Sequence, residues 1–490
     1  MAIVVFDTLQ TNNPPIYKSG GGGVYVVERQ INIQDMKKIL TTAIKPFEIL
    51  IAAALLSAGC CTRHTGTPKD REITAQLKSF ISQKTAQANG SGASPEINKF
   101  FTAAQKGDWQ ATDRIFKQIS TSPDRTSGKL KGPAWEDVKE VWGGLEAFYE
   151  GNEKYSQAFG HDVIQSIPAG SIYFGGTDPG RFIVTALCPS QVNGEPFFVL
   201  TQNALADSSY LDYLHGMFDG KISLPTPADS KKCFDDYSTN AAQRLYNNQL
   251  KPGESVTRDA NGQLQISGLV SVMEINGLLV KNIFDKNPDR EFYIEESFPL
   301  DWMYPQLEPH GLIMKLNRQP LATLSNEIVS QDHDYWAKYV TPMIGSWLNS
   351  DTSVQEVADF AKKTCLEKNL SGFHGDPEFL NNQNTQKMFS KLRSSIAGLY
   401  VWRAHHSKDD SDKTRMAAEA DFAFRQALAL CPYSPEAVFR YVNFLLEQNR
   451  LSDALLIAET AAQMPPMLGN DGAALRQMIE QLKAYQHKGA

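Results

Sequence analysis

The sequence lacks an excess of positive charge. Its 490 residues contain 48 Lys and Arg against 55 Asp and Glu, which gives a formal net charge of -7. A protein that neutralises a phosphate backbone needs a basic surface, so this balance argues against a nucleic-acid partner. The chain is 42% hydrophobic, which excludes wholesale disorder and leaves apolar material for two or three cores.

Cysteine pairs with the two-residue spacing of a zinc or thioredoxin-like motif are missing too. The six cysteines stand at positions 60, 61, 188, 233, 365 and 431. We therefore predict no metal centre, and nothing in the sequence predicts a cofactor. If one disulfide forms, Cys188 and Cys233 are the pair that we expect, because both fall in one expected domain. The alternative is that the four scattered cysteines are buried small hydrophobic side chains.

Long apolar runs are rare as well. The longest, residues 49–58, is well short of the roughly 20 residues that span a bilayer. It follows a basic start at residues 36–38, and this order is that of a secretory signal. Residues 57–60, Ser-Ala-Gly-Cys, resemble the lipobox of bacterial lipoproteins, which implies lipid attachment at Cys60. Secretion without a lipid is the alternative.

Composition divides the chain into six segments. The expected segments are a non-native extension (1–35), a signal peptide with lipobox (36–60), a tether (61–94), a helical region (95–166), an α/β domain (167–320) and a helical domain with repeats (321–490). The tether is assigned because its residues are polar and rich in Lys, Gln, Ser and Gly. We expect an exported protein, periplasmic or at the outer membrane of a Gram-negative-type bacterium, which contacts the membrane through its lipid anchor alone.

The middle of the chain alternates strand and helix patterns. Strand patterns at residues 171–174 and 197–201 are each followed by a helical pattern, at 182–187 and 210–218. This alternation predicts a central parallel, Rossmann-like sheet flanked by N-terminal helices. Tyr173 and Val199 should then lie on adjacent parallel strands. Further strand patterns follow at residues 256–266 (a hairpin), 291–294 and 311–316.

The C-terminal third is helical and contains a repeat. Four residues recur 34 positions later, Ala420, Phe424, Ala427 and Pro432 matching Ala454, Ala458, Ala461 and Pro466. Small and aromatic residues at these offsets, with proline after the second helix, are typical of the tetratricopeptide repeat (TPR). The fold class is therefore α/β plus all-α, with a C-terminal TPR-like array whose groove binds a protein partner.

A glycine-rich turn follows the first strand of the α/β domain. Glycines allow backbone N–H groups to approach a ligand, the start of the next helix favours an anion, and the Arg181 guanidinium can pair with it. The predicted ligand-binding residues of this turn are Gly175, Gly176, Thr177, Asp178, Gly180 and Arg181. The alternative is a tight strand-to-helix turn in which Asp178 caps the helix and Arg181 makes an internal ion pair.

Polar side chains also follow the next strand. Gln202 and Asn203 suit a hydroxyl-rich ligand such as a glycan, and the ends of parallel strands meet at one edge of a sheet. Asp207 has two readings, a helix N-cap or a further site residue. The carboxylates Asp178, Asp207 and Glu295 also support a second hypothesis, a carbohydrate-active enzyme for glycosyl transfer or hydrolysis.

Residues 168–317 resemble the soluble α/β region of transmembrane protein O-mannosyltransferase-like proteins, which often end in TPR repeats. The matching motifs are Gly-Ser-Ile-Tyr-Phe at 170–174, Phe-Phe-Val-Leu-Thr-Gln-Asn at 197–203, Tyr-Leu-Asp-Tyr-Leu at 210–214 and Leu-Glu-Pro-His-Gly-Leu at 307–312. That family transfers sugar with a multi-pass membrane portion, which this sequence does not contain. The resemblance therefore implies a non-catalytic recognition or scaffold lipoprotein, with a TPR region for proteins and an α/β domain for a glycan or glycopeptide.

Overall fold

The computed structural model describes residues 74–122, 132–176, 178–188, 194–251, 253–259, 262–295, 300–464 and 472–489. These residues fall into two compact units. Lys231–Ile275 belong to a smaller unit, and the other described residues belong to a larger one. The predicted extension, signal peptide and lipidated Cys60 lie outside the described residues.

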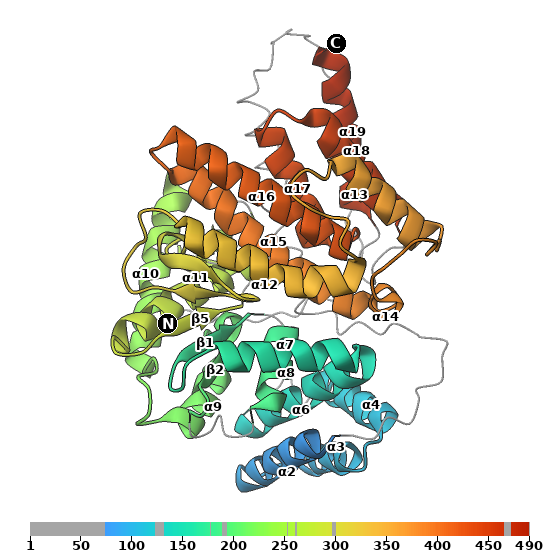
Figure 1. Cartoon of the computed structure of the whole chain (residues 1–490). Coiled ribbons are helices and arrows are strands. Elements are labelled where there is room, and N and C mark those ends of the chain that lie inside the picture. Colours follow the sequence, from blue (N-terminus) through green and yellow to red (C-terminus); the bar gives the residue numbers. More distant parts are fainter. Residues whose placement is uncertain are drawn as a thin grey trace, which may run out of the picture. The chain divides into compact units, whose positions relative to one another are not determined.

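The larger unit begins with a group of helices (Figure 1). Their buried side chains form a core rich in aromatic residues. The helices are α2 (Ala75–Gly90), α3 (Pro95–Gln105), α4 (Trp109–Ser120), α6 (Pro133–Glu150) and α7 (Glu153–Ser166). Helix α2 lies where the polar composition predicts a tether. Its Phe80 and Ile81 are buried against Phe100 and Trp142, so this half of the segment is part of the core. The polar residues that suggested a tether are mostly on the other face of the helix.

A break separates α6 from α7, where the apolar spacing predicts one helix over residues 135–159. Gly151 is extended, and the Asn152 side chain accepts a hydrogen bond from the Tyr155 backbone N–H. An asparagine cap of this kind starts a new helix because it satisfies an N–H group that has no partner within the helix.

The sheet of the larger unit has five strands in the order β2-β1-β5-β7-β6. They are β1 (Ile172–Gly175), β2 (Phe198–Thr201), β5 (Phe292–Ile294), β6 (Leu307–His310) and β7 (Ile313–Leu316). Strand β1 pairs in parallel with β2 and β5, and Tyr173 lies opposite Val199 as expected. Strand β7 is antiparallel to both β5 and β6. The sheet is therefore mixed, and the expectation of a parallel sheet holds for three of its strands.

The antiparallel half arises from a tight turn that the sequence analysis did not identify. Strand β6 was not predicted, and Gly311 turns the chain from β6 into β7 with a φ of +65°. That conformation favours glycine, which has no Cβ to clash. The coarse fold class, α/β together with helical regions, is confirmed.

Helices cover the parallel half of this sheet. Helix α8 (Asp178–Leu187) connects β1 to β2 and packs on both strands, and α6 and α7 pack on α8. Helix α9 (Ser208–Phe218) follows β2 after the short 3-10 turn η2 (Gln202–Ala204). All residues of β1, β2 and β5 are buried, as strands between helices should be.

The smaller unit is a hairpin with helical flanks. It contains most of α10 (Pro227–Tyr246), the antiparallel strands β3 (Ser255–Arg258) and β4 (Leu264–Ser267), and the start of α11 (Leu269–Lys286). This hairpin confirms the expectation for residues 256–266, whereas α10 was not predicted. Tyr237 lies in the core of the unit, where its hydroxyl donates to Glu254 at 2.7 Å.

Paired helices form the rest of the larger unit (Figure 1). They are α12 (Asn326–Ile344), α13 (Val354–Ala361), α14 (Pro377–Leu380), α15 (Gln383–His406), α16 (Asp410–Leu430), α17 (Pro435–Glu447), α18 (Leu451–Gln463) and α19 (Ala473–Gly489). Helix α15 packs along α16, and α17 packs along α18. The repeated Ala420, Phe424, Ala454 and Ala458 are all buried in these pairs.

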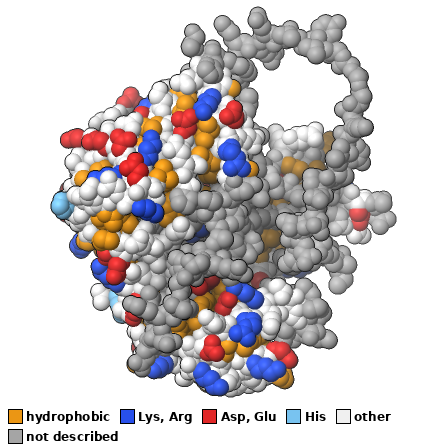
Figure 2. Space-filling model, turned by 90° about the vertical axis from the view of Figure 1, so that its right-hand side faces the viewer, with side chains coloured by type: hydrophobic (Ala, Val, Ile, Leu, Met, Phe, Trp, Pro, Cys, Tyr) orange, Lys and Arg blue, Asp and Glu red, His pale blue; other side chains and the backbone are white. Residues whose placement is uncertain are grey.

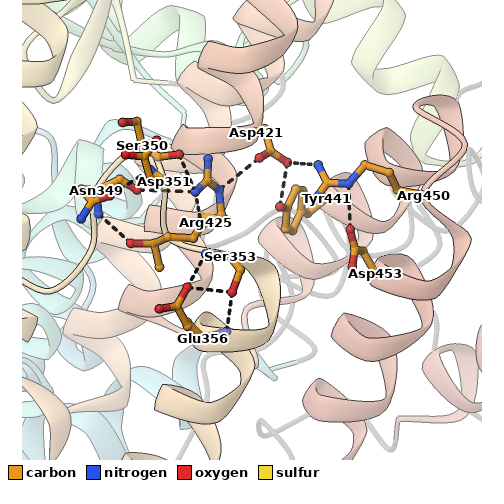
Figure 3. A network of polar contacts seen from close by, with 11 residues as sticks. Asn349, Ser350, Asp351, Ser353, Glu356, Asp421, Arg425, Tyr441, Arg450 and Asp453 are labelled. Atoms are coloured by element: carbon orange, nitrogen blue, oxygen red, sulfur yellow. Dashed lines mark hydrogen bonds and ion pairs between the residues drawn. The ribbon is translucent and has the colours of Figure 1, made fainter.

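Arg425 joins these helices to the loop that precedes α13. From α16 it donates to the backbone carbonyls of Ser350, at 3.1 Å, and Thr352, and it forms an ion pair with Asp421 (Figure 3). Asp421 also accepts hydrogen bonds from Tyr441 on α17 and from Arg450 beside α18. A single network of polar contacts therefore holds the two helix pairs in position.

Candidate functional site

The predicted glycine-rich turn contains a carboxylate from the chain itself. The Gly176 backbone N–H donates to Glu295 Oε2 at 3.3 Å. A Cβ atom added to Gly180 would overlap the same Glu295 carboxylate. The start of a helix attracts an anion, and here Glu295 at the end of β5 lies in that position at the start of α8. The glycines thus allow an internal anion to approach the backbone.

Arg181 is turned into the protein. Its side chain is 7% exposed and forms ion pairs with Glu136 at 3.4 Å and Glu140 at 3.3 Å, both on α6. The guanidinium also lies 5.2 Å from the ring centre of Tyr210. This is the internal ion pair of the alternative interpretation, and it leaves Arg181 almost no surface for a ligand.

The amides after β2 are placed differently from one another. Asn203 is partly buried, and its Nδ2 lies 3.5 Å from the Gly176 carbonyl oxygen. The expected meeting of the β1 and β2 ends is therefore found. Gln202 is fully buried, so it cannot contact a solvent-borne glycan in this conformation. Asn276 of α11 holds this turn by donating to the Asn203 carbonyl at 2.9 Å.

Asp207 caps helix α9. Its carboxylate accepts a hydrogen bond from the Ser209 backbone N–H at 2.9 Å, which is the capping role that the sequence allowed. Thr177 lies outside the described residues, as does the side chain of Asp178. Gly175 lies at the end of β1, packed against the Arg181 backbone.

A buried cluster of charges lies behind the turn. Lys84 of α2 is fully buried, and its Nζ lies 2.6 Å from both Glu140 Oε2 and the Tyr213 hydroxyl. Asp137 Oδ1 is 3.5 Å from the same Nζ. This cluster was not predicted from the sequence, because Lys84 lies in the segment whose polar composition indicates a tether. One feature of the sequence indicated a buried charge cluster. Glu136, Asp137 and Glu140 lie close together in a helix whose other residues are mostly apolar.

The two acids beside Lys84 ionise differently. Burial raises the pKa of Asp137 to about 7, against the opposing attraction of Lys84. Burial also disfavours ionisation of Glu140, but the charges of Lys84 and Arg181 outweigh it and lower the pKa of Glu140. Near neutral pH the cluster therefore contains an ionised Glu140 and an Asp137 that is partly protonated.

An open apolar pocket of about 50 Å³ lies elsewhere in the larger unit. Side chains of α2, α6, α7 and α8 line it, among them Leu77, Phe148 and Ile183. None of the predicted ligand-binding residues lines this pocket.

Within the described ranges, no group of three or more His, Cys, Asp or Glu side chains is arranged to hold a metal ion. Among the helices that the structure describes, none combines the length and apolar character needed to cross a membrane. No protein-family model matches the chain, and neither a curated protein nor a solved structure matches it.

Gly180→Ala should destabilise the larger unit by about 1–3 kcal/mol, because the new methyl group displaces the buried Glu295 carboxylate. Chemical unfolding measures the change. Gly216→Ala is the matched control on α9: nothing lies within 4 Å of its added Cβ, so stability should stay equal or rise by up to about 1 kcal/mol. In a Glu295→Ala background the cost of Gly180→Ala should fall, and an unchanged cost would show that Glu295 is not the obstacle.

Asp137→Asn should flatten the dependence of stability on pH. The folded-state pKa of about 7 lies above the usual aspartate value of 3.8, so the folded state binds this proton more tightly than the unfolded state does. The contribution of protonated Asp137 to the free energy of unfolding is fully present below about pH 4, and it is lost as the pH rises through about 7. Urea unfolding between pH 5 and 8 should show a smaller loss in the variant. Asp212→Asn, at an exposed position of α9, should retain the parental profile, and equal slopes for all three proteins would contradict the assignment.

Proposed function

We propose that this protein is a non-catalytic scaffold of the bacterial cell envelope, exported by its signal peptide and anchored by a lipid at Cys60. The observation that supports a non-catalytic role is that charged residues at the predicted ligand-binding edge of the sheet contact other groups of the protein. Glu295 lies against the glycine turn, Arg181 pairs with Glu136 and Glu140, and Asp207 caps a helix. A general acid or base must reach a substrate proton, and these groups are occupied within the fold.

The C-terminal helix pairs provide the scaffold. We propose that α15–α16 and α17–α18 are two TPR-like units, and that β2, β1 and β5 are the remnant of a Rossmann-like sheet. The support for the repeats is that residues 34 positions apart, such as Ala420 and Ala454, are buried at equivalent places of α16 and α18. Two units are too few to be stable alone, and α12, α13 and α14 pack against them.

A protein partner is proposed to bind at the end of this array. The sequence suggested a groove, which in a TPR is lined by the first helix of each pair. Yet α17 has no exposed residue, and α15 has exposed residues only near its two ends. Helix α19 is more open: its Met478 and Leu482 are buried, whereas Arg476, Gln477 and Glu480 are exposed. We therefore place the partner on the polar face of α19.

The charges on the surface fit a protein partner better than a nucleic acid. Figure 2 shows Lys and Arg side chains interspersed with Asp and Glu on the face in view, and the net charge of the chain is -7. A glycan or glycopeptide has less support, because Arg181 and Gln202 are buried and Asn203 remains the accessible amide among the predicted contacts.

Acylation at Cys60 tests the envelope location. The full chain, made in a Gram-negative host, should give a mature N-terminus at a diacylglyceryl-modified Cys60 by intact and peptide mass spectrometry. Cys60→Ser should abolish the modification and leave the chain unprocessed, whereas Cys61→Ser should still be acylated. A mature terminus at another residue without an acyl group would refute the anchor.

Photo-crosslinking in the native cell tests the partner surface. A photoreactive residue at Gln477 should give a discrete crosslinked species of higher mass, because α19 presents this side chain to solvent. The same residue at Arg114, exposed on α4 in the helical region before the sheet, is the control and should give none. Equal crosslinking at both positions, or none at Gln477, would contradict a docking face on α19.

A further inference from the structure

One surface loop of the C-terminal region is exposed along its whole length. It begins at the last residue of η4 (Lys362–Leu366), a π-helical turn that continues α13, and residues 366–372 are all exposed. Leucine side chains are usually buried, yet those of Leu366 and Leu370 are 37% and 38% exposed. No other part of the described chain therefore covers this loop.

The thiols of the protein are not accessible in this way. The four cysteines among the described residues are buried and unpaired, so no disulfide joins Cys188 to Cys233. This is the alternative that the sequence allowed, in which the cysteines are small buried side chains. An enzyme that modifies the folded protein must therefore act on other side chains, at the surface.

The exposed loop contains the acceptor motif of N-linked glycosylation. Residues 369–371, Asn-Leu-Ser, have the pattern Asn-x-Ser/Thr with a residue other than proline in the middle. A carboxylate two positions before the asparagine adds a charge that bacterial transferases of this class recognise, and Glu367 stands there. One other stretch of the sequence, residues 89–91, matches the three-residue pattern, and it has a glutamine in place of the acid.

Asn369 and Ser371 already contact each other in the folded chain. The Asn369 side-chain oxygen accepts hydrogen bonds from the Ser371 backbone N–H at 3.0 Å and from the Ser371 hydroxyl at 2.7 Å. This Asx turn brings together the carboxamide and the hydroxyl that the motif requires. Within the described residues no acceptor binds the Asn369 side-chain nitrogen, so this atom is available for reaction.

The backbone of the loop forms a defined turn rather than a helix. Lys368 and Gly372, one on each side of the motif, have φ values of +53° and +69°. The Asn369 N–H donates to the Lys363 carbonyl at 2.9 Å, and the Lys363 ammonium group donates to the Ser371 carbonyl at 2.7 Å. A transferase can therefore bind this segment without unwinding a helix.

The second motif is placed differently. Asn89 is exposed, but it lies in the last turn of α2. The Ser91 N–H donates to the carbonyls of Gln87 and Ala88, which continues the helical pattern, and no Asx turn forms. Acceptor asparagines lie in surface loops, so the structure favours Asn369 over Asn89.

We propose that Asn369 is a site of N-linked glycosylation. The side-chain nitrogen attacks the anomeric carbon of an oligosaccharide that is carried on a polyprenyl diphosphate. A C–N bond forms as the bond from that carbon to the phosphate oxygen breaks, the lipid diphosphate leaves with the bonding electrons, and the nitrogen gives up one proton. In the cell this inference rests on the proposed export, because the donor is consumed outside the cytoplasm.

Glycosylation of the folded full chain tests the site without export. The chain is purified from the cytoplasm of a host that lacks a transferase, and it is incubated with a bacterial oligosaccharyltransferase that requires the acidic residue and with a polyprenyl-diphosphate oligosaccharide. Mass spectrometry of tryptic peptides should find one oligosaccharide, on Asn369. A second transferase that reads only the three-residue motif should also modify Asn369 and should leave Asn89 unmodified.

Point variants separate recognition of the motif from effects on folding. Asn369→Gln and Ser371→Ala should abolish the mass shift with either enzyme, whereas Ser371→Thr should retain it. Glu367→Gln should abolish modification by the first transferase and retain modification by the second. All three positions are exposed, so the thermal unfolding of each variant should match that of the parent chain.

Two results would overturn the proposal. One is a folded chain that stays unmodified at Asn369 while a known acceptor protein is glycosylated in the same reaction. The other is modification of Asn89 as fast as that of Asn369, which would show that the turn does not select the site. If the purified chain is modified but the chain made in cells that contain the transferase is not, the proposed export fails and the assignment of Asn369 stands.

Discussion

The structure depends on the pairing of ionised side chains that are removed from water. Burying one charge alone is costly, and leaving it without its partner is more costly still. Lys84, Glu140 and Arg181 form a continuous chain of ion pairs between α2, α6 and α8. In the C-terminal helices Arg393 and Asp332 do the same at 2.7 Å, and both side chains are fully buried. These pairs link helices that are far apart in the sequence.

The same constraint explains the glycine-rich turn. A strand-to-helix turn with glycines, a helix start and an arginine has the composition of an anion site. Here Glu295 supplies the anion and Arg181 pairs with carboxylates of α6, so the helix start and the arginine are both neutralised from inside the protein. A turn of this kind stabilises the junction of three strands and a helix. The proposed scaffold role is consistent with this use of the motif.

Local patterns allowed much of the fold to be anticipated. The apolar spacing predicted β1, α8, β2 and α9 in their correct order, and the expected neighbours Tyr173 and Val199 are opposite each other. Strand β7 lies where the pattern at residues 311–316 predicted a strand, but its antiparallel direction could not be predicted, because strand direction depends on how the chain returns to the sheet. A strand has the same alternation of side chains in either direction.

The candidate site was less accessible to sequence reasoning. Its residues were identified as a group, and Gly176 and Asn203 do meet at the sheet edge. Their chemistry could not be inferred, because it depends on partners far away in the sequence. Arg181 pairs with Glu140, 41 residues earlier, and Lys84 contacts Tyr213, 129 residues later.

The amino-acid sequence by itself determined β1, α8, β2 and α9 in their order, and which residues recur 34 positions apart, because these patterns are present in the sequence itself. It allowed Asp207 to cap a helix without deciding that it does. The tertiary structure alone decided that Arg181 faces Glu136 and Glu140, and that Lys84 belongs to the core. The physical reason is that the residues next to a charged side chain in the sequence do not identify its ion-pair partner. That partner is fixed only when the helices pack.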